Sequence, residues 1–181
     1  GSLPPNNWGS LFGGPAWERV VGPEGPEQWY LHMFAPEQPD WDWANPAVVA
    51  LFDAVIRFWF DRGVDGLRVD VADGLAKAAG YPDTPIDPDT GLGIASFYPG
   101  HPWWNQPELD AIQRHWREIA DGYADRHLGE RIFVCEANTK PLDALMRFVD
   151  PGRMHTTFNF DMLWCEWEAG SLRAMIDRNL V

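Results

Sequence analysis

From residue 45 onward, helical and strand patterns alternate along the sequence, and this order constrains the fold more than any other feature. Apolar residues recur at steps of three and four in the helical stretches, whereas each strand stretch is a short apolar run. Strands separated by helices pair in parallel, because each helix crosses back over the sheet. We therefore predict an α/β fold with a parallel sheet. The predicted helices cover residues 45 to near 63, 108–121, 141–149 and 168–178, and the predicted strands cover 66–71, 131–137 and 156–162.

The apolar stripes of these helices indicate which side chains face the core. A stripe at three- and four-residue steps lies along one side of a helix, and such a side packs against the sheet. We therefore expect the stripes to be buried by packing and not to form an aromatic binding site. The stripe residues are Val48, Leu51, Phe52, Val55, Ile56, Trp59 and Phe60 in the first helix, Leu109, Ile112, Trp116 and Ile119 in the second, and Leu172, Met175 and Ile176 in the last.

Two stretches are rich in glycine and proline and lack a clear periodicity. Residues 1–44 contain many Gly, Pro, Asn and Trp residues, so we predict mostly loop there, with short strands near 29–33. The second stretch, 80–104, is about as long as a loop without function can be in a compact domain. Because it follows a predicted strand, it occupies a place where barrel enzymes carry substrate-binding loops.

The predicted strand at 66–71 carries two charged residues. In the stretch GVDGLRVDVADG (63–74), Arg68 and Asp70 are two residues apart and share one face of the strand, while Leu67, Val69 and Val71 share the other. Burial of both charges is tolerable only because they compensate each other. One interpretation is a structural ion pair at a strand end. The other is a catalytic carboxylate, with its ionised form favoured by the guanidinium beside it.

Composition excludes several classes of function. The net charge of −13 argues against binding to nucleic acid or to an anionic membrane, since both require basic patches. No apolar run approaches the ~18 residues of a membrane span. Two cysteines, Cys135 and Cys165, are too few for a disulfide framework, so a cytoplasmic location is expected. No Cys/His spacing indicates zinc, and we predict neither a metal ion nor a cofactor.

Several blocks of the sequence, in the same order, resemble the α-amylase superfamily of glycoside hydrolases (family 13), in its α-glucosidase and oligo-1,6-glucosidase branch. These blocks are PPNNWGSLFGGPAW (4–17), YLHMFAPEQPDWDWANP (30–46), GLRVDVADG (66–74), IFVCEA (132–137) and FNFDML (158–163). The resemblance implies part of a (β/α)8 TIM barrel, about strands 4 to 6 with their helices, over residues 45–181. Residues 1–44 would be the end of inserted subdomain B and its return loop, and the chain an internal fragment.

The resemblance also implies roles for individual residues. Asp70 would be the nucleophile and Glu136 the general acid/base of a retaining mechanism, which requires carboxyl groups about 5–5.5 Å apart. Glu136 has no obvious cationic neighbour in sequence, as suits a group that must hold a proton; considered alone, it could also be a solvent-facing acid at a strand end. The substrate, a small oligosaccharide, would contact Arg68, Val71, Asp73 and Phe34.

The sequence departs from this family at several points. Asp73 stands where the closest relatives usually carry histidine or asparagine, and Asn138 where tryptophan is usual. The family's third carboxylate and its histidine are missing, so we expect the chain alone to be inactive. The leading hypothesis is an α-glucosidase acting on short glucosides such as maltose or isomaltose. The alternatives are a transglycosylase or sugar isomerase (trehalose synthase, sucrose isomerase) and a non-catalytic binding relative.

Overall fold

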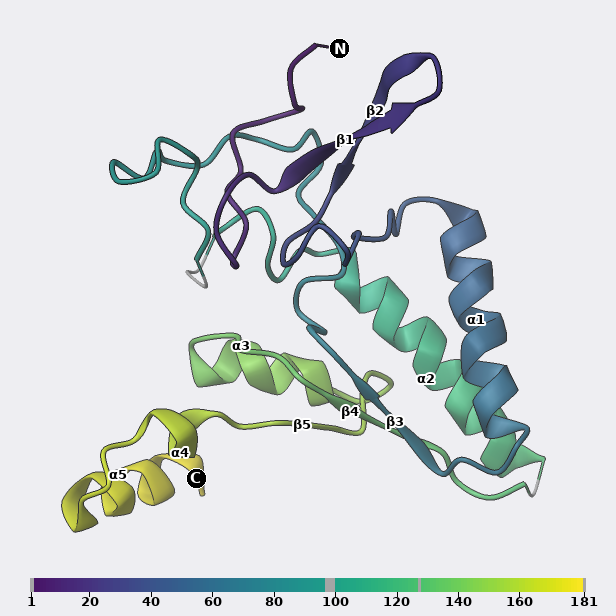
Figure 1. Cartoon of the computed structure of the whole chain (residues 1–181). Coiled ribbons are helices and arrows are strands. Elements are labelled where there is room, and N and C mark those ends of the chain that lie inside the picture. Colours follow the sequence, from purple (N-terminus) through teal and green to yellow (C-terminus); the bar gives the residue numbers. More distant parts are fainter. Residues whose placement is uncertain (1, 97–99, 127, 181) are drawn as a thin grey trace.

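The computed structural model describes residues 2–96, 100–126 and 128–180. The first regular elements are the strands of an antiparallel hairpin, β1 (Trp17–Gly22) and β2 (Gly25–Leu31). Helices and strands then alternate (Figure 1). In chain order they are α1 (Pro46–Phe60), β3 (Gly66–Val69), α2 (Leu109–Asp125), β4 (Ile132–Cys135), α3 (Leu142–Met146), the 3-10 turn η1 (Arg147–Val149), β5 (Thr156–Thr157), α4 (Asp161–Trp164) and α5 (Ala169–Asn179).

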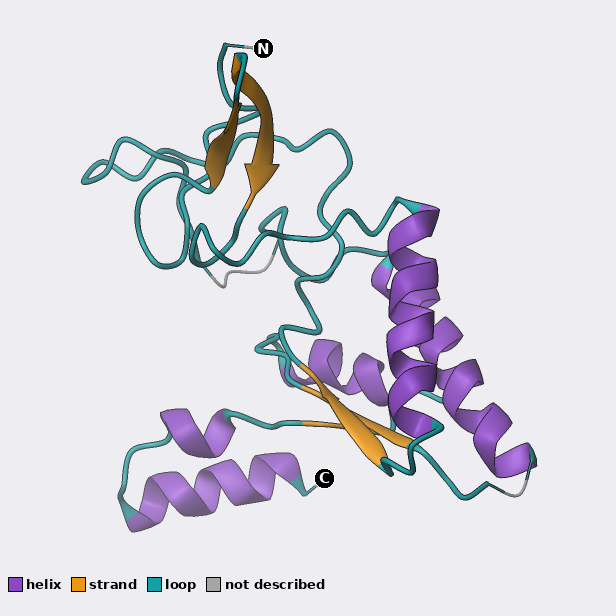
Figure 2. Ribbon diagram, turned by 45° about the vertical axis from the view of Figure 1, so that its right-hand side comes forward, coloured by secondary structure: helices purple, strands orange, loops and turns teal. Residues whose placement is uncertain are grey.

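The strands β3, β4 and β5 form a parallel sheet in that order, which confirms the predicted α/β fold (Figure 2). β3 and β4 pair along their whole length, with Val69 opposite Cys135. Both strands are shorter than the sequence pattern predicted. β3 ends at Val69 because the chain then turns, with Val71 in the left-handed region at φ 48°. The residue expected to be the last of this strand is therefore part of a turn.

The third predicted strand, 156–162, is wrong over most of its length. Only Thr156 and Thr157 pair with β4, and the helix α4 begins at Asp161. The reason is local, because the side-chain Oδ1 of Asn159 accepts a hydrogen bond from the backbone N–H of Asp161 at 2.8 Å. An asparagine that satisfies a free N–H in this way favours the start of a helix over an extended chain.

The predicted helices are confirmed, with shifts at their ends. α1 starts at Pro46, and the side chain of Asn45 accepts a hydrogen bond from the N–H of Ala47. α5 starts in a similar manner, since the carboxylate of Glu168 accepts from the N–H groups of Gly170 and Ser171. The predicted helix over 141–149 is two short pieces, α3 and η1.

The main hydrophobic core lies between the sheet and the helices α1 and α2. α2 contributes Trp116, Ile119, Ala120 and Tyr123, which are all buried. They belong to one cluster with Phe133 and Cys135 of β4 and with Ile56 and Phe60 of α1. The ring of Trp116 stacks on that of Phe133, with centroids 6.2 Å apart. The buried side of α2 thus packs against β4 and holds this strand in place from one side.

The stripe predicted for α1 is only partly buried. Val48, Ile56 and Phe60 are buried, but Leu51, Val55 and Trp59 are 45%, 41% and 45% exposed. The reason lies in the position of α1 at the β3 edge of the sheet: it packs against α2, and the described residues provide no helix on its other side (Figure 1). The stripe predicted for α5 is also only partly buried, since Met175 is buried but Ile176 is 45% exposed.

A second hydrophobic cluster joins the N-terminal segment to the long loop at 80–104. Trp8, Ala16, Trp17, Leu31 and Met33 pack in it with Trp103 and Trp104. The two segments also exchange main-chain hydrogen bonds, from the N–H of Gly9 to the oxygen of Gly93 and from the N–H of Gly93 to the oxygen of Asn7. The loop is therefore long because it forms a core of its own together with residues 6–33.

A buried ion pair ties the N-terminal segment to the turn after β3. Lys77 Nζ lies 2.7 Å from Asp40 Oδ1, and both side chains are largely shielded from solvent. Burial lowers the pKa of Lys77, and the charge and hydrogen bond of Asp40 oppose this shift. The second oxygen of Asp40 accepts a hydrogen bond from the N–H of Met33. One carboxylate thus connects three parts of the chain.

Lys77→Met in the protein containing this chain is expected to lower the free energy of unfolding by about 3 kcal/mol, because it leaves a buried carboxylate without its cation. Thermal unfolding followed by circular dichroism measures this effect. The double variant Lys77→Met/Asp40→Asn should recover part of the loss, since it removes both charges. Lys140→Met, at an exposed position, serves as the control. A double variant no more stable than Lys77→Met would contradict this role of the pair.

Candidate active site

The carboxyl ends of β3 and β4 bring three charged side chains together. Asp70 follows β3 directly, and Glu136 follows β4 directly. Because Val69 lies opposite Cys135 in the parallel ladder, the residues after each strand lie side by side. The backbone N–H of Val71 donates a hydrogen bond to Glu136 Oε2 at 3.3 Å. Residues that are 65 positions apart in the sequence are therefore hydrogen-bonded to each other at the carboxyl ends of the two strands.

Arg68 bridges the two carboxylates. Its Nη1 lies 2.6 Å from Asp70 Oδ1, and its Nη2 lies 2.8 Å from Glu136 Oε2. Glu136 has no cationic neighbour in the nearby sequence, as noted above, but the adjacent strand supplies one in the fold. The expected burial of the charged pair is wrong: the side chains of Arg68 and Asp70 are 46% and 66% exposed. The guanidinium is also 5.6 Å from the centre of the Phe158 ring.

A cavity of about 400 Å³ opens beside these carboxylates. Five of the six residues predicted for the site line it: Phe34, Asp70, Val71, Asp73 and Glu136. Arg68 lines an adjoining cavity of about 490 Å³, which shares Phe34, Asp70 and Val71 with the first. The structure thus gathers all six predicted residues around two neighbouring cavities, although their contacts with a substrate stay a prediction.

Several residues of the smaller cavity were missed by the sequence reasoning. They are Phe12, Gln38, Phe160, Leu163 and Trp164; Asn138, which stood out in the sequence as a departure from the family, also lines this cavity. Most of them stand inside or beside the sequence blocks that resemble the α-amylase superfamily, and that position was the available signal. Aromatic side chains such as Phe12, Phe160 and Trp164 present flat apolar faces, and sugars bind well against such faces.

Asp73 is the most deeply buried acid of the site, with only 3% of its surface exposed. Its Oδ2 accepts hydrogen bonds from the backbone N–H of Asn138 at 3.0 Å and from the hydroxyl of Thr139 at 3.1 Å. Burial raises the pKa of Asp73 to about 6, and these hydrogen bonds limit the increase. The charge of Glu136 contributes a smaller upward shift.

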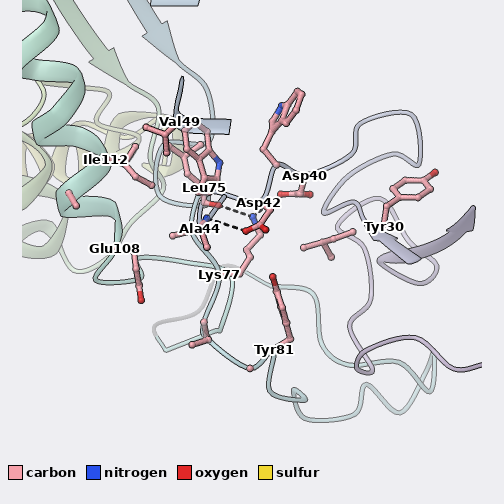
Figure 3. A pocket seen from close by; sticks show the side chains of 18 of the residues that line it. Tyr30, Asp40, Asp42, Ala44, Val49, Leu75, Lys77, Tyr81, Glu108 and Ile112 are labelled. Atoms are coloured by element: carbon pink, nitrogen blue, oxygen red, sulfur yellow. Dashed lines mark hydrogen bonds and ion pairs between the residues drawn. The ribbon is translucent and has the colours of Figure 1, made fainter. Parts of the chain in front are cut away.

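A larger cavity, of about 750 Å³, lies away from the paired carboxylates (Figure 3). Its walls come from the hairpin, from the segment before α1, from the turn that carries Lys77, and from α1 and α2. None of the six predicted site residues lines it. Two of its charged residues, Lys77 and Asp40, form an ion pair with each other.

Neither a metal centre nor a membrane-spanning helix occurs among the described residues. They contain no group of three or more His, Cys, Asp or Glu side chains arranged to hold a metal ion. Among them, no helix combines the length and the apolar character that crossing a bilayer requires. Cys135 and Cys165 are both free thiols.

The family model of the alpha amylase catalytic domain matches residues 1–176. The chain belongs to this family. The resemblance seen in the sequence blocks is therefore confirmed, and the three parallel strands with their helices form one arc of the (β/α)8 barrel of alpha-amylase enzymes. The proposed division of the chain at residue 44 stays a prediction.

Individual relatives support the same branch of the alpha-amylase family. An oligo-1,6-glucosidase of Heyndrickxia coagulans is 34% identical over 171 residues, covering 93% of this chain and 28% of that protein. A trehalose-6-phosphate hydrolase of Escherichia coli K12 is 54% identical over 80 residues, covering 44% of this chain and 14% of that protein. The solved structure of an alpha-glucosyl transfer enzyme has 32% identity and a TM-score of 0.75, covering 97% of this chain and 33% of that chain. The chain thus spans about a third or less of the length of these relatives.

Proposed function

We propose that the protein containing this chain is a retaining glycosidase that hydrolyses α-glucosidic bonds of short oligosaccharides such as maltose and isomaltose. The observation that carries the proposal is the position of Asp70 and Glu136 at neighbouring strand ends, bridged by Arg68, beside an aromatic cavity. Retaining glycosidases require two carboxyl groups with separate roles on either side of the scissile bond. The similarity to oligo-1,6-glucosidases supports the substrate class.

In the proposed reaction Asp70 attacks the anomeric carbon while Glu136 protonates the departing oxygen. Oδ1 of Asp70 contacts Arg68, so we assign the attack to Oδ2. Glu136, now a carboxylate, then takes a proton from water, and this water displaces Asp70 from the sugar with restoration of the α configuration.

A second candidate function is transfer of the glucosyl group to another sugar in place of water. The observation that favours it is the similarity to an alpha-glucosyl transfer enzyme, at 32% identity over 97% of this chain. Both functions use the same glycosyl intermediate and differ in the molecule that attacks it.

We further propose a cytoplasmic location, on the basis of the two free cysteines.

The test uses the complete protein with maltose, isomaltose and p-nitrophenyl α-glucoside, each followed by NMR from the first seconds of reaction. We expect glucose to appear first as the α anomer, because two inversions restore the starting configuration. A transfer enzyme would instead give mainly new oligosaccharides at high substrate concentration. First release of the β anomer, or no reaction with any α-glucoside, would refute the proposal.

A further inference from the structure

The hydrogen-bond ladder between β3 and β4 continues beyond both strands. The N–H of Glu136 donates to the oxygen of Val69 at 2.8 Å, and the N–H of Ala72 donates to the oxygen of Glu136 at 2.7 Å. The next N–H of the β4 side in this alternation belongs to Asn138. In a regular parallel ladder it would donate to the backbone oxygen of Val71.

The turn after Asp70 makes that main-chain bond impossible. Val71 adopts a left-handed conformation, and its oxygen accepts instead from the N–H of Gly74 at 2.9 Å. The side chain of Asp73 supplies the missing acceptor, because its Oδ2 takes the hydrogen bond from Asn138 N as well as that from Thr139 Oγ1. A carboxylate thus replaces a backbone carbonyl at the point where the sheet ends.

We propose that Asp73 is a positioning residue: it holds the segment 136–139 against the turn 70–73 and thereby keeps Glu136 in its place beside Asp70. This inference rests on the proposed function, in which Glu136 is the acid/base. Glu136 is held on its other side by Arg68 and by the N–H of Val71. If the segment were released at residues 138–139, the carboxyl group of Glu136 would therefore meet a substrate at a different angle.

A residue can hold a neighbour only if it is itself fixed, and Asp73 meets this condition. Its backbone oxygen accepts a hydrogen bond from the N–H of Asn105 at 2.8 Å. The adjacent Gly74 is packed so closely that a Cβ atom there would lie 2.7 Å from the ring of Trp104. The carboxylate is also almost fully shielded from solvent, so water cannot easily replace its two donors.

The experiment compares Asp73→Ala, Asp73→Asn and Thr139→Val in the complete protein. Asp73→Ala should lower kcat 10- to 100-fold with KM within threefold, because a displacement of about 1 Å at a catalytic group has effects of this size. Asp73→Asn should recover most of this loss, since its amide oxygen accepts the same two hydrogen bonds. Thr139→Val removes one of the two donors and should lower kcat to an intermediate degree. If Asp73→Ala does not fold, Thr139→Val still tests the proposal.

Hydrogen–deuterium exchange, measured without substrate, supplies an independent readout. The peptide covering 136–142 should exchange at least fivefold faster in Asp73→Ala than in the unchanged protein and near the original rate in Asp73→Asn. Asp143→Ala, which removes an exposed acid close by, is the control and should alter neither kcat nor exchange at 136–139.

Unchanged exchange in both Asp73→Ala and Thr139→Val would overturn the proposal, and so would an activity loss in Asp73→Asn equal to that in Asp73→Ala. A loss that appears in KM alone would equally contradict it, because it would indicate a substrate contact. If the unchanged protein hydrolyses no α-glucoside, the proposed function fails, while the exchange rates still decide whether Asp73 holds the segment.

Discussion

Asp70→Asn in the complete protein is expected to lower kcat by at least about 10⁴-fold with every α-glucoside, because the variant lacks the nucleophile on which both chemical steps depend. The substitution preserves the shape of the side chain, and its amide oxygen can still accept a hydrogen bond from Arg68. The fold should therefore persist, so the loss of kcat would reflect the chemical steps and not unfolding. Steady-state kinetics with p-nitrophenyl α-glucoside, together with the melting temperature, gives both quantities.

The control for this variant is Asp89→Asn, the same substitution on the exposed loop between β3 and α2. It should leave kcat within twofold of the original value. A mechanism-based fluoroglucoside should also label the unchanged protein on the peptide that contains residues 66–74, as found by mass spectrometry. A label on another peptide, or a loss below 100-fold in Asp70→Asn, would exclude Asp70 as the nucleophile.

Glu136→Gln should produce a loss that depends on the leaving group. Disaccharides need a proton on the departing oxygen, so their hydrolysis should fall by about 10²–10⁴-fold. A dinitrophenyl glucoside departs without that proton, and its first step should survive, so that the glycosyl intermediate accumulates as an initial burst of released phenol. Stopped-flow absorbance measures the burst, and disaccharide assays measure the loss.

Azide provides the matched control for this second variant. It attacks the intermediate without needing a base, so it should accelerate turnover of the dinitrophenyl glucoside by Glu136→Gln and give α-glucosyl azide. The same addition should not restore Asp70→Asn in that way, since no intermediate forms on Asp70. Equal losses for disaccharides and the activated glucoside would contradict the role of Glu136 as acid.

The sequence predicted the parts of the fold that depend on local patterns. The period of α2, with Trp116 and Ile119 on its buried face, and the cap at Asn45 both follow from a few neighbouring residues. The partial exposure of the α1 stripe could not be predicted. The periodicity shows which residues share one side of the helix, but it does not show how much of that side other elements cover. The strand predicted at 156–162 failed because one side chain, Asn159, favours a helical turn.

The site shows the same division between local and distant information. Asp70 and Glu136 were identified from their sequence blocks, and their proximity follows from parallel pairing. The contact between Arg68 and Glu136 depends on the register of two strands 66 residues apart, which no local pattern specifies. The contact of Asp73 with Asn138 requires in addition the left-handed turn at Val71, which is unusual for a β-branched residue.

The shared core of the long loop and the N-terminal segment limits how such loops can be exchanged between enzymes. A designer who transplants residues 80–104 alone would leave Trp103 and Trp104 without Trp8, Trp17 and Met33, the partners that bury them. The main-chain bonds of Gly93 would be lost as well. The smallest transferable module is therefore discontinuous: it consists of the loop and the segment 6–33 together, moved as one unit onto a recipient barrel.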